Sequence, residues 1–366
     1  MNTSQDREYQ ALLALLRAGL WEKAVDDLTL FPLSDEQWKR VYTLSCEQTV
    51  SGIIYRGISH LPEDMMPSEM EMIRWAARVD AIERRSKRVN HTLNGLHNLL
   101  VKHNLHPILQ KGYVVAQMYA NPLLRESGDI DLWFQPQEWD AARALASTIT
   151  GRVESMADGC SLYFFEGIEI EHHRKFFDIQ NPAKKHYLYT LFEADENRAM
   201  YAKERKEGIN KPSPLANIVL QNTHILKHSL GLGIGLRQLC DLARTYYTLS
   251  DVYDGEQLKT IYKKLGLKRW SNMLHSFLVE HIGLEPRYLP YQLDGKEPTT
   301  QFAEIVKRGG NFGQHSQHRI SAGDGVWSRK FNTLCGFLRS LRFAIRYAPL
   351  EFGYRISELT IGQLRR

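Results

Sequence analysis

Two aspartates one residue apart are the residues of this sequence best suited to chemistry. Asp129 and Asp131 lie in the run GDIDLWF, whose apolar residues predict a β-strand. Because side chains alternate along a strand, both carboxylates project from the same face. Two like charges that close are unfavourable unless a cation lies between them. The pair therefore predicts a cation site, although so short a pattern is also common in turns and solvated strand edges.

A second β-type run offers a further carboxylate. Residues 168–171 read IEIE, which places Glu169 and Glu171 on one face of a second strand. Three carboxylates from two adjacent strands would form an oxygen-only site. Such a site suits Mg²⁺ or Mn²⁺ holding a nucleoside triphosphate. Glu171 and Glu169 are both candidates for the third position.

The residues before the aspartates predict a phosphate-binding arrangement. Lys111 and Gly112 precede a short helical run, and the free N–H groups and positive dipole of a helix N-terminus favour an anion. Lys111 and Arg125 can add positive charge, although Arg125 could instead hold the loop. The residues expected to contact phosphates are Lys111, Gly112, Arg125, Ser127 and Gly128.

These motifs together resemble a known family. Lys-Gly, then Arg-x-Ser-Gly-Asp-Ile-Asp-Leu, then Glu171-His-His-Arg is similar to the uncharacterised nucleotidyltransferase family of the polymerase-β-like superfamily, and the likeness covers most of residues 100–315. The resemblance implies an α+β fold, in which a polymerase-β-like core of a small mixed sheet with helices is flanked by helical N- and C-terminal regions. It also implies that Asp129, Asp131 and Glu171 bind metal and that His173 is the motif histidine.

The resemblance further implies a reaction. A nucleoside monophosphate would move from a nucleoside triphosphate to a hydroxyl, with release of pyrophosphate. Asp129 and Asp131 would hold two divalent ions, and Glu171 would hold the ion that activates the hydroxyl. The main alternative is a catalytically inactive nucleotide-binding or scaffold protein. The acceptor is not readable from the sequence, but a small molecule or protein is favoured over nucleic acid.

Four more residues are candidates for contact with substrate or for the cleft. His173 follows the third carboxylate and could contact substrate or act as a base. His228 lies one helical turn after His224. The pair lacks the glutamate of a zinc-protease motif, so its spacing alone does not predict a zinc site. The resemblance favours a place for His228 in the cleft. Arg237 and Asp241 are also one turn apart. They form either a simple ion pair, or a unit in which Arg237 faces the triphosphate and Asp241 orients it.

Composition limits the class of protein. The 366 residues are 43% hydrophobic and carry a formal charge of +5, which permits acidic ligands without requiring nucleic acid. No apolar run reaches the roughly 18 residues of a membrane span. The start lacks the form of a signal peptide, so we expect a cytoplasmic protein. The cysteines are far apart and are expected to be reduced thiols: Cys46, Cys160, Cys240 and Cys335.

The hydrophobic pattern and the family resemblance together divide the chain into four regions. We expect a helical region at 1–104, a nucleotidyltransferase core at 105–180, a helical domain closing the cleft at 181–310, and a mobile loop with a basic helical tail at 311–366. The basic and aromatic tail could bind nucleic acid or an anionic membrane. Its apolar spacing more strongly favours a helix that docks on its own domain.

Overall fold

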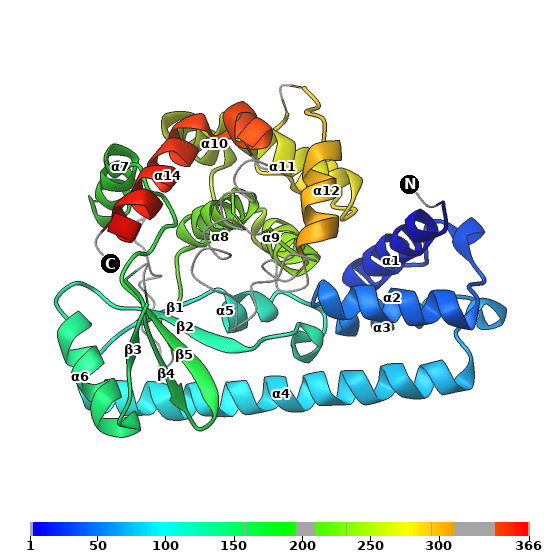
Figure 1. Ribbon diagram of the computed structural model, residues 1–366, viewed down its shortest axis with the longest axis horizontal. Helices are drawn as coiled ribbons and strands as arrows, with labels where there is room; N and C mark the ends of the chain where they lie inside the picture. Colours follow the sequence, from blue (N-terminus) through cyan, green and yellow to red (C-terminus); the bar gives the residue numbers. More distant parts are fainter. Residues whose placement is uncertain are drawn as a thin grey trace.

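The computed structural model describes residues 3–156, 159–194, 209–231, 233–293, 295–310 and 341–364. The fold is α+β, as the sequence predicted: one small sheet is surrounded by helices from both halves of the chain (Figure 1). Of the region expected at 311–366 to form a mobile loop and a basic helical tail, residues 311–340 lie outside the described residues.

The sheet contains five strands in the order β1-β2-β5-β4-β3. Their bounds are β1 Ile108–Gln110, β2 Asp129–Trp133, β3 Glu154–Ser155, β4 Ser161–Phe165 and β5 Ile168–His173. β2 and β5 are parallel and the other pairs are antiparallel, so the sheet is mixed. The β4–β5 hairpin turns at Glu166 and Gly167, whose φ angles of 50° and 73° are both positive. A two-residue turn of this kind matches the twist of the strands that it joins.

Helices form most of the rest of the described chain. The α-helices are α1 Thr3–Trp21, α2 Asp35–Glu47, α3 Ser51–Ile58, α4 Glu69–Lys102, α5 Gly112–Ala116, α6 Trp139–Thr150, α7 Pro182–Ala194, α8 Pro214–Ser229, α9 Leu236–Leu249, α10 Gly255–Leu265, α11 Lys268–Glu280, α12 Thr300–Gly309 and α14 Pro349–Leu364. Short 3₁₀ turns occur at Leu28–Leu30, Glu63–Met65, Pro122–Leu124 and Pro286–Tyr288. The start of α2 is fixed by a capping box, in which the side chains of Ser34 and Gln37 each bond the backbone N–H of the other.

The long helix α4 connects two hydrophobic cores. Near its start, Trp75 is buried in a large core that also contains side chains of α1–α3 and α8–α12. Farther along, Val89, Leu93 and Leu96 pack in a second core with the sheet and α6. Figure 1 shows α4 running beneath both the sheet and the N-terminal helices. The helix therefore fixes the sheet relative to the helical part of the chain.

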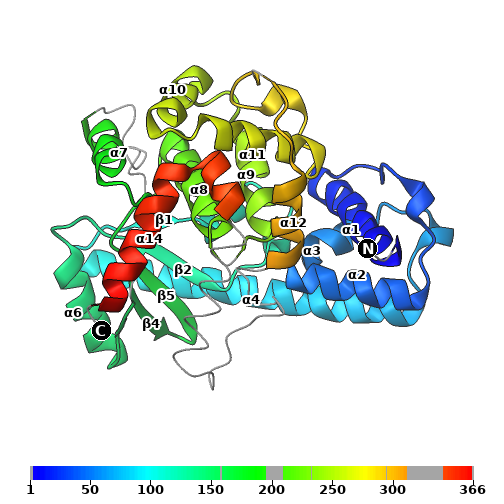
Figure 2. The ribbon, with the colours of Figure 1, turned by 45° about the horizontal axis from the view of Figure 1, so that its top comes forward.

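The described part of the tail docks on the same chain. Residues 341–347 are helical, and Phe343, Tyr347 and Phe352 are buried in the large core. The carboxylate of Glu351 at the start of α14 accepts hydrogen bonds from the backbone N–H groups of Gln180 and Asn181. Figure 2 shows α14 running from the helical layer toward the sheet. These contacts support the docking interpretation of the tail. No helix in the described part of the chain is long and apolar enough to cross a membrane.

Two glycines allow α1 and α3 to pack at close range. A Cβ atom at Gly57 would lie 2.0 Å from the carbonyl oxygen of Leu15, and one at Gly19 would lie 2.0 Å from that of Ile53. Both contacts are with backbone, which cannot swing aside. The seam between these helices therefore depends on the absence of side chains.

We predict that Gly57→Ala lowers the free energy of unfolding by roughly 1–3 kcal/mol, the usual cost of overpacking. The control is Gly95→Ala on the exposed face of α4, where a new Cβ meets nothing within 4 Å. That change should raise stability by up to about 1 kcal/mol, because alanine has the better helix propensity. Urea denaturation measures both. Equal effects of the two substitutions would contradict the packing account.

Candidate active site

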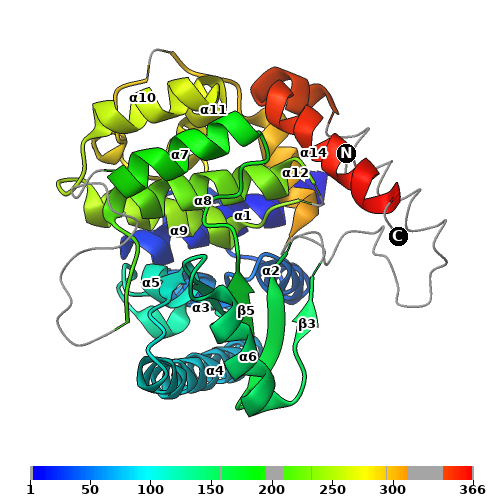
Figure 3. The same cartoon turned by 90° about the vertical axis from the view of Figure 1, so that its left-hand side faces the viewer.

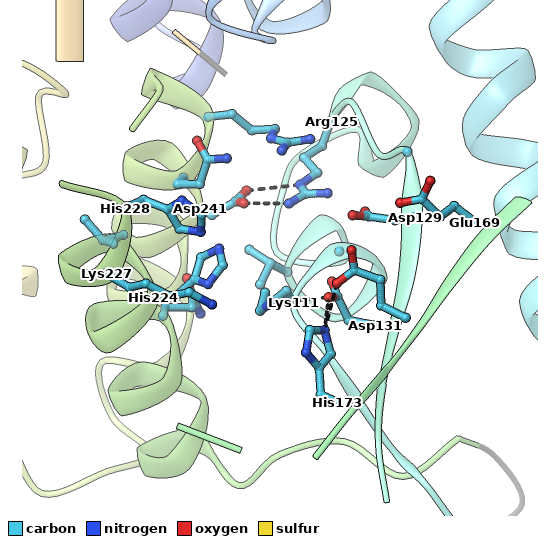
Figure 4. A pocket seen from close by; sticks show the side chains of 18 of the residues that line it. Lys111, Arg125, Asp129, Asp131, Glu169, His173, His224, Lys227, His228 and Asp241 are labelled. Carbon is cyan, nitrogen blue, oxygen red and sulfur yellow. Dashed lines mark hydrogen bonds and ion pairs between the residues drawn. The ribbon is translucent and has the colours of Figure 1, made fainter. Parts of the chain in front are cut away.

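Four carboxylates gather on one face of the sheet. The parallel register of β2 and β5 places Asp129 opposite Glu169 and Asp131 opposite Glu171. Because residues two apart on a strand share a face, all four side chains project to the same side. They line a cavity of about 560 Å³ between the sheet and the helices (Figure 4). The acids expected from two adjacent strands are thus brought together.

Three side chains converge closely enough to bind one ion. Asp131, Glu171 and His173 each offer a ligand atom, and these atoms lie within 4.8 Å of one another. His173 Nε2 lies 2.6 Å from Asp131 Oδ1 and 3.2 Å from Glu171 Oε2. Opposite ligands of a divalent ion are separated by about twice a bond length of roughly 2.0–2.6 Å, so the spacing fits. Glu171, rather than Glu169, belongs to this group.

Lys111 and His173 balance the charge of Asp131. Lys111 Nζ donates a hydrogen bond of 3.2 Å to Asp131 Oδ1. Burial alone would raise the pKa of Asp131, but the charge of Lys111 and the hydrogen bond from His173 outweigh it and hold that pKa well below its usual value. Burial likewise opposes the charge of Lys111, but Asp131 and the other carboxylates raise its pKa above the ordinary value. The carboxylate and the ammonium therefore both stay ionised.

The negative charges of Asp129 and Glu169 are less well balanced by nearby cations than that of Asp131. Burial and the negative charge of Asp131 raise the pKa of Asp129. Burial and the charge of Glu171 raise that of Glu169. Both shifts have the same cause, which is burial next to like charge. A bound divalent ion would relieve the repulsion.

Arg125 holds the loop before β2, which was the alternative to phosphate contact. Its guanidinium is buried and donates to both carboxylate oxygens of Asp241, at 3.1 and 2.6 Å. It also donates a hydrogen bond of 2.6 Å to Ser127 Oγ. Tyr119 completes the group by donating from its hydroxyl to Asp241 at 2.7 Å. Of the expected phosphate contacts, the cavity wall contains Lys111, Gly112, Arg125 and Gly128, whereas the Ser127 hydroxyl is engaged by Arg125.

Asp241 thus bonds an arginine other than the one predicted. The sequence suggested Arg237, one turn earlier on α9, but Arg125 lies far away along the chain. Arg237 instead donates a hydrogen bond of 2.8 Å to the carbonyl oxygen of Glu126 and reaches the cavity wall. Local spacing could not reveal this pairing, because it depends on how α9 packs against the loop before β2.

The second wall of the cavity comes from α8 and α9. His224, Lys227 and His228 of α8 all line it, and Figure 4 shows them across from the acidic face. Asp178, in the segment between β5 and α7, bonds His224 Nδ1 and Lys227 Nζ, each at 2.8 Å. The expected place of His228 in the cleft agrees with this geometry. Among the described residues, these histidines are not part of a group that could hold a metal.

Several lining residues were not predicted. They are Arg85, Phe164, Gln221, His224, Ile225, Lys227 and Gln238, together with Val115. Arg85 comes from α4 and donates a hydrogen bond of 2.6 Å to the carbonyl oxygen of Gly128. The only available signal was on α8, where Lys227 and His228 follow His224 by one turn and so share its face. Nothing in the sequence near Arg85 or Asp178 distinguishes them from surface charges.

The buried Arg125–Asp241 pair leads to a stability prediction. Asp241→Ala should cost about 3–5 kcal/mol, because it leaves a buried guanidinium without its counter-charge. The double variant Arg125→Met/Asp241→Leu removes both charges and should recover much of that loss. Thermal and urea denaturation of the three proteins measure the effect. A single variant as stable as the wild type would show that the pair does not fix the loop.

One comparison with known proteins matches this chain. The model of a family described as uncharacterised nucleotidyltransferase matches residues 34–279, a span that includes both walls of the cavity. Searches of curated proteins and of solved structures found no match. The family model covers more than half of the 366 residues. The chain therefore belongs to the uncharacterised nucleotidyltransferase family.

Proposed function

We propose that this protein is a metal-dependent nucleotidyltransferase that moves a nucleoside monophosphate from a nucleoside triphosphate to a hydroxyl acceptor and releases pyrophosphate. The observation that carries the proposal is the convergence of the Asp131 and Glu171 carboxylates, both in contact with His173, on an acidic face that lines a large cavity. Family membership supports the class of reaction. In the transfer, the acceptor oxygen bonds the α-phosphorus as the bond to the bridging oxygen of the β-phosphate breaks.

The proposed metal ligands are Asp129, Asp131 and Glu171, with Glu169 as the alternative to Glu171. Bound there, Mg²⁺ or Mn²⁺ would neutralise phosphate charge and make the acceptor hydroxyl easier to deprotonate. Asp129 and Asp131 would hold the ions on the nucleotide side, and Glu171 would hold the ion on the acceptor side. His173 contacts both Asp131 and Glu171, so we assign it the role of orienting these carboxylates.

The proposed nucleotide contacts begin at the turn between β1 and α5. Lys111 has a φ of 47°, an unusual value for a residue with a side chain, and this backbone turn directs its ammonium to Asp131. Gly112 begins α5 and lines the same cavity. Gly128 and Arg237 complete the nearby wall. These residues would hold the phosphates against the acidic face.

The acceptor is proposed to be a small molecule or a protein side chain. A cavity of about 560 Å³ is within the usual size range of small-molecule sites. The alternative function, an inactive nucleotide-binding or scaffold protein, would retain the same cavity without turnover. We also propose a cytoplasmic location; the free thiols of Cys46, Cys160 and Cys240 support a reducing compartment.

The first functional prediction concerns metal-linked binding. Nucleoside triphosphate should bind weakly without Mg²⁺ and more tightly with it, because the carboxylates repel phosphate until ions intervene. Asp129→Asn/Asp131→Asn should abolish this Mg²⁺ dependence without unfolding the protein. The control is Asp140→Asn, an exposed change in the first turn of α6. Titration calorimetry that gave the wild type equal affinity with and without Mg²⁺ would count against the site.

The second functional prediction separates enzyme from scaffold. Glu171→Gln keeps the size of the side chain but removes its charge, so triphosphate binding should largely survive. Turnover should fall by about a hundredfold or more, as expected when a group that activates the nucleophile is lost. The matched control is Glu169→Gln, two residues earlier on the same face of β5, which should lower turnover much less.

A screen of labelled nucleoside triphosphates against small molecules and proteins provides the readout. If Glu169→Gln is the damaging change, the third ligand is Glu169 and the mechanism stands. If the wild type transfers no label to any acceptor while it still binds metal and nucleotide, the scaffold alternative is the better account.

A further inference from the structure

The expected phosphate contacts before β2 are largely engaged in other interactions. Arg125 is paired with Asp241, and the Ser127 hydroxyl accepts a hydrogen bond from Arg125. Lys111 is bonded to Asp131. A triphosphate carries several negative charges, so Lys111 and Arg237 are a small set of cationic partners for it. Further cationic contacts should come from elsewhere in the cavity wall.

The cavity-facing side of α8 has the required character. The whole helix, Pro214–Ser229, contains no acidic residue, whereas the opposite wall carries four carboxylates. Lys227, His224 and His228 line the cavity within little more than one turn. Burial lowers the pKa of both histidines, so Lys227 is the cation of this group. Ions held on the acidic face and the Lys227 ammonium on α8 would therefore face a phosphate chain from both sides.

Asp178 holds two of these side chains in place from behind. One carboxylate oxygen bonds Lys227 Nζ and the other bonds His224 Nδ1, each at 2.8 Å. Asp178 is not itself part of the cavity wall. Burial would raise its pKa, but Lys227 and His224 outweigh burial and keep Asp178 ionised, with a pKa well below the usual value. An ammonium has three donors, so Lys227 can bond Asp178 and a phosphate oxygen together.

His224 is oriented by the same carboxylate. Because Nδ1 bonds Asp178, Nε2 is the ring nitrogen on the side away from that carboxylate. Burial and the charge of Lys111 lower the pKa of His224 to about 4, so the ring is neutral before an anion binds. An anionic phosphate at Nε2 would favour the imidazolium, which donates from both nitrogens. Lys111 opposes protonation of His224, and a charge on His224 would in turn favour the ionised form of Asp131. Figure 4 shows Lys111 between α8 and Asp131.

We propose that Lys227 and His224 of α8, positioned by Asp178, form a second phosphate-binding wall that grips the β- and γ-phosphates of the nucleoside triphosphate. This inference rests on the proposed function and adds a binding role for residues that no comparison assigns. The phosphates would lie between α8 and the acidic face, with Lys111 at their side. Arg125 and Ser127 would shape the loop rather than bind phosphate.

Calorimetric binding of inorganic tripolyphosphate and of ATP, each with Mg²⁺, to the full chain tests this proposal. Tripolyphosphate has no base or sugar, so it isolates the phosphate contacts. Lys227→Met and His224→Gln should each weaken binding of both probes by at least about tenfold, the effect of losing a hydrogen bond to a charged group. Ser127→Ala should weaken it less than either.

The matched control is Lys307→Met in α12. Lys307 pairs with Asp6 at 2.7 Å and its side chain is 26% exposed, close to the 2.8 Å and 25% of Lys227. It lies outside the cavity wall, so its loss should leave binding within about twofold, as for a surface ion pair. If Lys227→Met unfolds because Asp178 is left unpaired, the double variant Asp178→Asn/Lys227→Met removes both charges and should show the same tenfold loss.

The outcomes separate the two proposals. Loss of tripolyphosphate and ATP binding in the α8 variants, but not in Lys307→Met, supports the phosphate wall. If Lys227→Met and His224→Gln both bind the two probes as tightly as the wild type does, or if only Ser127→Ala loses binding, the phosphate-wall proposal is wrong. The proposed function is then unaffected. A wild type that binds neither probe with Mg²⁺ overturns the proposed function itself, and the phosphate wall with it.

Discussion

The parallel pairing of β2 with β5 is the constraint on which the site depends. Its register sets Asp131 beside Glu171 and Asp129 beside Glu169, and the pleat directs all four carboxylates to one side. Such a face is electrostatically unfavourable unless positive charge lies against it. Within the described chain, that charge comes from Lys111 and His173 inside the face and from Arg237 and Lys227 across the cavity. A divalent ion would supply more.

The helices maintain the distance between the two walls. The Arg125–Asp241 pair joins the loop before β2 to α9, and Arg85 of α4 bonds Gly128 at the start of the strand. Seen from the side, α8 and α9 lie above the sheet while α4 lies below it (Figure 3). Asp178 then fixes the orientation of side chains on α8. The carboxylate face and the α8 wall that carries Lys227 therefore meet across a space that is formed before any ligand binds, which lowers the cost of binding.

The features of the site that depend on local backbone geometry could be predicted from the sequence, whereas those that depend on tertiary packing could not. The strand period of two placed Asp129 and Asp131 on one face of a strand and Glu169 and Glu171 on one face of another. The partner of Asp241 could not be predicted in this way, because the pair with Arg125 forms only when α9 packs against the loop. Asp178 and Arg85 were missed for the same reason: each lies outside the motif, and only tertiary structure brings it to the cavity or to a residue that lines it. The division of the chain into domains stays a prediction.

The most direct test of the central claim is anomalous diffraction from crystals of the full chain soaked with Mn²⁺ and a non-hydrolysable nucleoside triphosphate. The account predicts a Mn²⁺ peak between the carboxylates of Asp131 and Glu171, with metal–oxygen distances of about 2.0–2.6 Å. The phosphates should lie between that peak and α8. Nucleotide bound with no Mn²⁺ peak on the acidic face, or with its ion held elsewhere on the protein, would contradict the account.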